Sequence, residues 1–195
     1  MADFHQDPLI TNLHGLYEAF DKASYLTNLE RRLEQHAQHE NLSLLLPSLH
    51  SEMANAGVLD RILDQIQEVR YLNNIVVALG GATEERQFLE AKEYFGRLET
   101  PERDVRIVWI DGPRIQGLLG EMAERGIASG VQGKGQSVWV ALGYLFARDE
   151  SDVIALHDCD IVTYDRTLLG RLFEPVANPN NDFQFCKGYY ARIPP

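Results

Sequence analysis

The segment LSLLLP (42–47) is a short apolar run ended by proline, which is typical of a β-strand buried on both faces. Three further apolar runs of strand length follow it: NIVVAL (74–79), VRIVWI (105–110) and DVIALHD (152–158). Segments with the apolar spacing of helices lie between them: 57–69, a stretch beginning near Thr83, 115–126 and 136–147. Strands that alternate with helices predict an α/β domain with a mostly parallel sheet and helices on both faces.

The N-terminal region has a different pattern. Residues 11–39 carry leucines and aromatics at helical spacing with charges between them, which predicts a long helix. Its end, ERRLEQHAQHE (30–40), is polar, and we expect it to be exposed. We therefore divide the chain into an N-terminal helical arm (1–40) and an α/β domain (41–195). The arm would pack either on that domain or on a second copy of the chain in a homo-oligomer.

Composition narrows the function. Of the 195 residues 45% are apolar, and 29 Asp and Glu outnumber 18 Lys and Arg, for a net charge of −11. Nucleic acids and anionic membranes are bound chiefly by basic surfaces, so neither is expected as a partner. No secretory signal or membrane-length apolar run occurs, which predicts a cytoplasmic protein. Cys159 and Cys186 are expected to be reduced thiols.

Small and acidic residues follow the predicted strands. Pro47, Gly80-Gly81, Asp111 and the pair Asp158 and Asp160 all fall at carboxyl ends of strands, where open parallel sheets bind their ligands.

The aspartate pair has three interpretations. It is a Mg²⁺ or Mn²⁺ site, the nucleophile motif of a haloacid-dehalogenase-type phosphatase, or a solvated turn. The phosphatase motif usually follows a first strand, whereas this pair follows a fourth and precedes only 161–195. Zinc is disfavoured, because we expect His157 and Cys159 to face opposite ways.

Gly133-Lys134-Gly135 precedes a predicted helix, an arrangement suited to a phosphate group. A P-loop is excluded because Ala128 stands where that motif needs glycine, and Gly135 where it needs Ser or Thr. A flexible turn with a surface lysine explains this stretch equally well.

These motifs, taken in order, resemble a family. The chain has LPSL (46–49), QGKG (132–135) followed by Trp139, DCD (158–160) and CKGYYAR (186–192). This resembles the family-2-like glycosyltransferases of GT-A fold, whose domain is Rossmann-like. It is most similar to glucosyl-3-phosphoglycerate synthases and related glucosyl- and mannosyl-glycerate synthases. Those enzymes have a proline at the first strand end, a PGKG turn before a tryptophan-containing helix, a DSD metal motif and a KGYY or KGFY strand.

The resemblance implies a set of roles. Pro47 and Leu49 would frame the nucleoside pocket, with Glu52 and Gly80 beside them, and Lys134 would meet the diphosphate. Asp158 and Asp160 would hold Mg²⁺ or Mn²⁺ and through it the donor, Asp160 being the more direct ligand. Residues on the sugar or acceptor side would be Lys187, Gly188 and Tyr189.

The chain also departs from the family pattern. The Asn-Glu-Glu of the family reads His50-Ser51-Glu52 here, and the Asp-Ser turn after the second strand is replaced by 80–82. The acceptor loop and a later metal-binding histidine are missing from the sequence.

The implied function is metal-dependent, retaining transfer of a hexose from a UDP- or GDP-linked sugar to a small hydroxy acid such as glycerate or 3-phosphoglycerate. The alternative is a non-catalytic nucleotide-sugar-binding module or inactive partner subunit. No catalytic residue is assigned.

Overall fold

The computed structural model describes residues 11–188, without the side chains of 11–20, 55 and 56. Its sheet has four parallel strands in the order β3-β2-β1-β4: β1 (Leu42–Leu49), β2 (Asn74–Gly80), β3 (Asp104–Trp109) and β4 (Val153–Leu156). The helices are α1 (Thr11–His36), the 3-10 helix η1 (His50–Asn55), α2 (Ala56–Gln67), α3 (Glu85–Gly96), α4 (Pro113–Glu124), α5 (Lys134–Arg148) and α6 (Arg166–Ala177). All four predicted strands are present, so the expected parallel α/β domain is confirmed.

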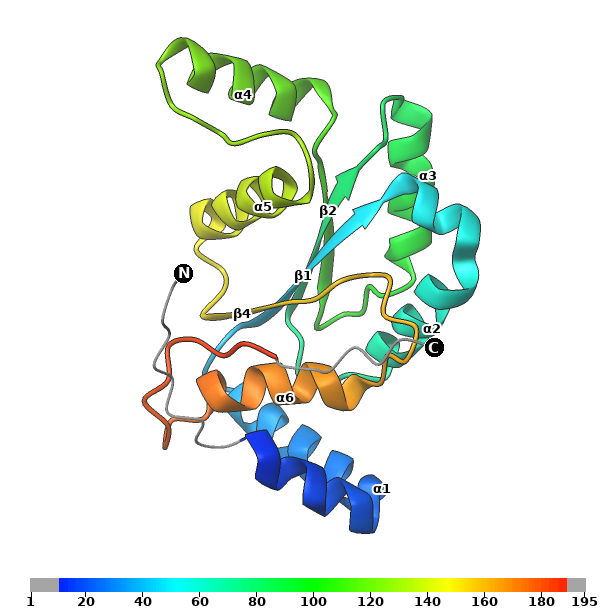
Figure 1. The fold of residues 1–195 in the computed structure, drawn as a ribbon, viewed down its shortest axis with the longest axis vertical. Helices are drawn as coiled ribbons and strands as arrows, with labels where there is room; N and C mark the ends of the chain where they lie inside the picture. Colours follow the sequence, from blue (N-terminus) through cyan, green and yellow to red (C-terminus); the bar gives the residue numbers. More distant parts are fainter. Residues whose placement is uncertain (1–10, 189–195) are drawn as a thin grey trace.

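Side chains of the central strand alternate between two cores. Leu44 and Leu46 join the core formed with α1, α2, α3 and α6, whereas Leu45 joins the one formed with α4 and α5. Figure 1 shows α4 and α5 on one side of the sheet and α2 and α3 on the other. Both faces are therefore covered, which explains why the strands are apolar throughout rather than alternating.

The strand order creates a break in the connections. From β1 the chain moves outward to β2 and β3, and then returns across the sheet through α4 and α5 to place β4 on the free side of β1. The direction of winding reverses between β1 and β4. Such a reversal leaves a crevice at the carboxyl ends of the two strands, where ligands bind in open α/β sheets.

The N-terminal helix packs more closely than its polar end predicts. Leu29 and Leu33 are fully buried against α6, and Arg32 donates to Glu174 at 2.7 Å. A Cβ atom at Gly170 would lie 2.7 Å from the Leu29 side chain, so Leu29 packs directly against the backbone of α6. The expected exposed tail is confirmed in part: Leu33 is buried, whereas residues such as Arg31 and Glu34 are exposed. The first ten residues of the predicted arm lie outside the described part of the chain.

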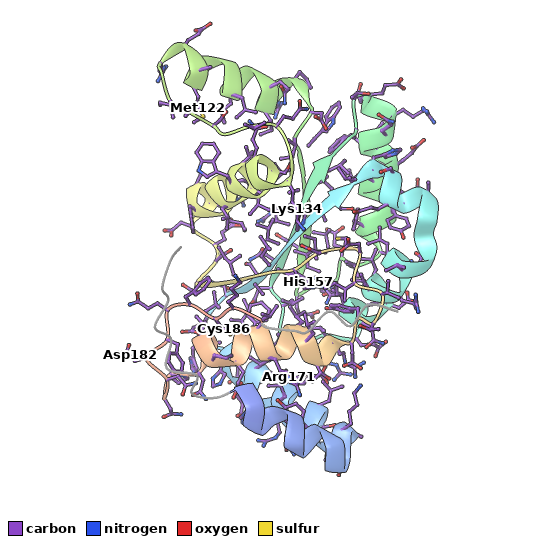
Figure 2. The ribbon with its side chains drawn as sticks, viewed as in Figure 1. Met122, Lys134, His157, Arg171, Asp182 and Cys186 are labelled. Carbon is purple, nitrogen blue, oxygen red and sulfur yellow. The ribbon has the colours of Figure 1, made fainter. Side chains whose placement is uncertain are left out.

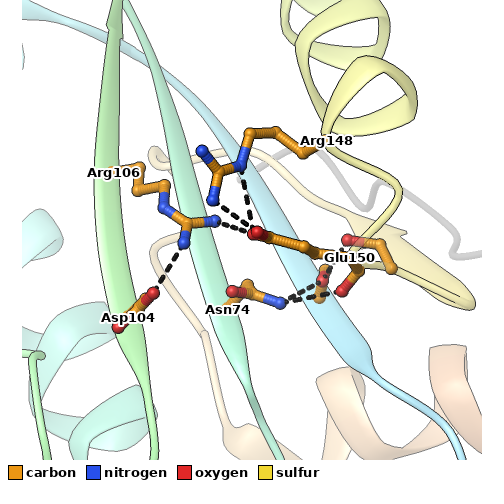
Figure 3. A network of polar contacts seen from close by, with 7 residues as sticks. Asn74, Asp104, Arg106, Arg148 and Glu150 are labelled. Atoms are coloured by element: carbon orange, nitrogen blue, oxygen red, sulfur yellow. Dashed lines mark hydrogen bonds and ion pairs between the residues drawn. The ribbon is translucent and has the colours of Figure 1, made fainter.

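The amino ends of the strands carry a polar network (Figure 3). Arg106 on β3 bonds Glu150 at 2.5 Å and Asp104 at 2.6 Å, and Arg148 at the end of α5 also bonds Glu150. These hydrogen bonds, that from Arg148 first, hold the pKa of the Glu150 carboxyl below its usual value. Asn74 joins this network through the Glu150 carbonyl, at 3.1 Å.

Candidate functional site

A cavity of about 380 Å³ opens at the carboxyl ends of β1 and β2, beside the loop that follows β4 and the start of α5. Its lining includes every donor-side and metal residue expected from the sequence: Pro47, Leu49, Glu52, Gly80, Lys134, Asp158 and Asp160. Segments more than a hundred residues apart in the chain thus meet at one point, which is where the winding of the sheet reverses.

Lys134 and Asp158 face each other across this cavity. Lys134 is the first residue of α5, and its ammonium group forms an ion pair with the Asp158 carboxylate. The preceding Gly133 has φ 149°, a backbone conformation that favours glycine and turns the chain sharply into the helix. The turn therefore brings a cation and a helix N-terminus to the same wall of the cavity. Lys134 is labelled in Figure 2.

Glu52 is held by the end of β1. Its Oε2 atom accepts hydrogen bonds from the Ser48 hydroxyl at 2.9 Å and from the backbone N–H of Leu49 at 3.0 Å. This oxygen satisfies a backbone donor that η1 would otherwise leave exposed. A contact between Glu52 and a ligand would therefore fall to its other oxygen, Oε1.

A second acidic side chain fixes the wall beyond β2. Asp111 accepts a hydrogen bond of 2.6 Å from the backbone N–H of Gly81, whose φ of 71° is left-handed. Trp109 bonds the Ala82 carbonyl at 2.5 Å and stacks on Phe88. The glycine turn at 80–82 is therefore held by β3. The sequence analysis placed Asp111 at the end of a strand but gave it no hydrogen-bond partner.

Sequence reasoning missed Ser137, which lines the cavity one turn into α5 and bonds the Gly133 carbonyl at 3.1 Å. The spacing of four residues from the glycine turn places it on the cavity side of the helix. That spacing was readable in the sequence, but a lone serine is too common in helices to single out.

The segment after β4 buries every second residue. His157 and Cys159 are 5% and 3% exposed, while Asp158 and Asp160 line the cavity. The expectation that His157 and Cys159 face opposite ways was wrong, because alternate residues of an extended segment point to the same side. Burial raises the pKa of the Cys159 thiol to about 12, so the thiol stays protonated. Burial also lowers the pKa of His157 to about 4. Within residues 11–188, no cluster of three or more His, Cys, Asp or Glu is arranged to hold a metal ion.

The residues expected on the sugar or acceptor side lie elsewhere. Lys187 and Gly188 are not in the cavity lining, and a side chain at Gly188 would touch Leu172 of α6 at 3.5 Å. Tyr189 lies outside the described residues. The roles expected of these three residues stay predictions.

The parallel sheet and the acidic, lysine-bearing cavity at its point of reversal define a Rossmann-like domain of the GT-A type. No helix within the described residues is both long and apolar enough to cross a membrane.

Comparison with known proteins identifies the relatives. The chain is 42% identical over 193 residues to a glucosyl-3-phosphoglycerate synthase of Persephonella marina, covering 99% of this chain and 45% of that protein. It is 38% identical over 192 residues to a protein of the same name from Methanococcoides burtonii, covering 98% and 44%. The resemblance expected from the motifs is thus confirmed: over nearly its whole length the chain is similar to two proteins named glucosyl-3-phosphoglycerate synthase.

The chain spans a little less than half the length of these curated relatives. No family model matches it. No solved structure matches it either.

Proposed function

We propose that this chain forms the nucleotide-sugar site of a glycosyltransferase that transfers glucose to 3-phosphoglycerate with retention at the anomeric carbon. The strongest support is the convergence on one cavity of seven residues that the sequence resemblance assigned to the donor and its metal. The names of the two relatives support glucose as the sugar and 3-phosphoglycerate as the acceptor.

In this proposal the cavity is divided by chemistry. Pro47 and Leu49, at the end of β1, give an apolar edge on which a nucleoside would lie. The turn at 80–82 gives a close backbone approach on the same side. Lys134 and the N-terminus of α5 supply positive charge and N–H donors for the diphosphate, the group that leaves in the reaction.

A divalent cation fits the acidic side of the cavity. Four carboxylates line it, from Glu52, Asp111, Asp158 and Asp160, against the single ammonium of Lys134. A diphosphate would be repelled by this set unless more positive charge entered with it. Mg²⁺ characteristically takes one or two protein carboxylates and fills its remaining positions with phosphate oxygens and water, so two aspartates suffice.

Asp158 and Asp160 would hold the cation, and its chemistry would be stabilisation of the negative charge that develops on the departing diphosphate. The protein's own contribution is to place that charge against Lys134. Because Lys134 now pairs with Asp158, a cation at Asp158 would release the ammonium toward the diphosphate.

The proposal is tested by calorimetric titration of UDP-glucose and GDP-mannose into the purified chain, with Mn²⁺ and then with chelator. Asp160→Asn is the matched variant, since it removes one charge and keeps the shape. We expect saturable binding of UDP-glucose that chelator and the substitution both abolish. Binding that ignores metal would overturn the cation site. Absence of binding by the folded chain would overturn the donor site.

Transfer is tested separately, by mass spectrometry of mixtures that also contain 3-phosphoglycerate. Formation of the glucosylated acid is the expected result. Donor binding without transfer would instead favour a nucleotide-sugar-binding module.

A further inference from the structure

His157 lies directly next to the aspartate pair in the sequence but is not part of the cavity lining. It follows the last residue of β4 and precedes Asp158, and its side chain is almost fully buried. Figure 2 shows it beneath Lys134, between the sheet and α6. Its position raises the question of what a buried imidazole does next to an expected metal ligand.

Both ring nitrogens of His157 have partners. Nδ1 lies 3.0 Å from the backbone carbonyl oxygen of Asp158, and Nε2 lies 3.2 Å from the hydroxyl of Tyr164. A carbonyl oxygen only accepts, so Nδ1 is the donor in either protonation state of the ring. The imidazole and phenol rings are also in contact, with their centroids 4.9 Å apart.

These contacts close a loop. Tyr164 stands just before α6, at the far end of the segment that carries both aspartates. Its side chain reaches back to His157 at the near end, and the ring of His157 in turn holds the Asp158 carbonyl. The segment from 157 to 164 is thus fixed at both ends by one imidazole.

Asp160 depends on this frame more than its neighbour does. Asp158 has the Lys134 ammonium as a partner, whereas Asp160 makes no hydrogen bond or ion pair with any other described residue. The buried Cys159 between them packs in the core and also has a side-chain hydrogen bond with Ser48. The backbone held by His157 and Cys159 is therefore what places the Asp160 carboxylate.

We propose that His157, held by Tyr164, is a positioning residue that fixes the turn of Asp158 and Asp160 for a divalent cation and the donor diphosphate. The inference rests on the proposed function, because it assumes that the pair binds a cation. His157 is not a catalytic residue in this scheme, since it is buried and both its nitrogens are engaged within the protein.

Two substitutions distinguish the hydrogen bond that His157 donates from the packing of its ring. In His157→Asn the amide nitrogen is attached where Nδ1 is, so donation to the Asp158 carbonyl is retained. In His157→Gln the amide extends one bond further, toward Tyr164, and that donation is lost. The readout is the Mn²⁺ concentration that gives half-maximal UDP-glucose binding, with the metal-free affinity and thermal midpoint of each variant measured alongside.

We expect His157→Gln to raise the required Mn²⁺ concentration about 10- to 100-fold, as loss of outer partners of metal ligands does, and His157→Asn to raise it far less. Without Mn²⁺, neither variant should bind UDP-glucose, as expected for the unchanged protein. Tyr164→Phe, which removes only the hydroxyl, should raise the requirement by several-fold. Tyr94→Phe is its control. This substitution also removes one hydroxyl, which donates a hydrogen bond to Asp60 at 2.7 Å, away from the cavity.

The outcomes distinguish the two proposals. If the unchanged protein shows no metal-dependent binding, the proposed function fails and the positioning role fails with it. If it does show such binding, but Asn and Gln at 157 behave alike or follow only the thermal midpoint, His157 is a packing residue and the inference alone is overturned.

Discussion

The two ends of the sheet carry similar side chains in different arrangements. A cavity of about 370 Å³ lies at the amino ends and one of about 380 Å³ at the carboxyl ends, and each is lined by four acidic side chains and one basic one. At the amino end, Arg106 and Arg148 hold Glu150 and Asp104 in a network (Figure 3). At the carboxyl end, one lysine serves one aspartate, and Asp160 has no partner within the described chain.

The size and charge of a cavity therefore do not distinguish a ligand site from a structural one. What differs is the source of the counter-charge. At the amino end, arginines on β3 and α5 supply it and pair with Asp104 and Glu150. The carboxyl end has more acid than its own cation neutralises, which favours a cation that enters with a ligand.

The strongest test of this contrast removes one charge from each end. Asp158→Asn should weaken metal-dependent binding of UDP-glucose by about a hundredfold, because several kcal/mol of charge stabilisation depend on this carboxylate. Asp149→Asn removes a charge from the lining of the other cavity, at a left-handed position that asparagine tolerates. It should leave binding unchanged. Equal losses in the two variants, measured by calorimetry, would erase the distinction between the ends.

The converse substitution acts on stability. Arg106→Met leaves Asp104 and Glu150 without their shared cation and should lower the free energy of unfolding modestly, since both acids are substantially exposed. Arg86→Met, at the exposed pair with Glu90, should cost less than about 0.5 kcal/mol. Urea denaturation measures both. Loss of UDP-glucose binding in Arg106→Met, with the fold intact, would contradict a purely structural network.

Two glycines with the same backbone sharpen the comparison further. Gly81 and Gly126 have φ of 71° and 72°, so alanine at either should cost about 1 kcal/mol of stability through backbone strain. Neither new methyl group meets anything closer than ordinary contact distance. Only Gly81 lines the cavity, so Gly81→Ala alone should weaken donor binding, by several-fold. Equal binding by both variants would place the ligand away from the turn at 80–82.

The smallest effect is in the response to acid. The pKa of Glu150 is lowered in the folded protein by hydrogen bonds from Arg148 and then Arg106. The unfolded chain therefore binds a proton more readily, and the network's contribution is present above the ordinary Glu pKa of 4.5 and lost as pH falls below it. The urea midpoint should fall less steeply between about pH 5 and pH 3 in Arg148→Met than in the unchanged protein. Identical slopes in the two proteins would show that Glu150 does not contribute to the pH dependence of stability.

Much of the fold was readable in the sequence. The run at 42–47 became β1, ending two residues later, and the other strand predictions were each within two residues of the structure. Helix starts were also close. The helix expected to begin near Thr83 is α3, which begins at Glu85 with Glu84 as its N-cap. Apolar strands and helix caps are patterns of neighbouring residues, so they can be recognised in the sequence. The apolar runs form strands here because both faces of the sheet are covered.

Contacts between distant segments were not readable. No local pattern indicates that Leu33 faces α6, or that the Tyr164 hydroxyl returns to His157, since each contact depends on how two helices or a loop cross. The same is true of the network at Arg106, whose partner Glu150 lies 44 residues away in the chain.

The sequence by itself determined which residues stand at the strand ends, because apolar runs and the glycines, proline and acids that end them are properties of neighbouring residues. It also indicated the relatives, through the order of its own motifs, and identities of 42% and 38% confirmed them. Only the tertiary structure decided that Lys134 pairs with Asp158 and that Asp160 has no such partner among residues 11–188. The physical reason is that parallel strands gather their carboxyl ends at one edge, and the order β3-β2-β1-β4 selects which ends adjoin.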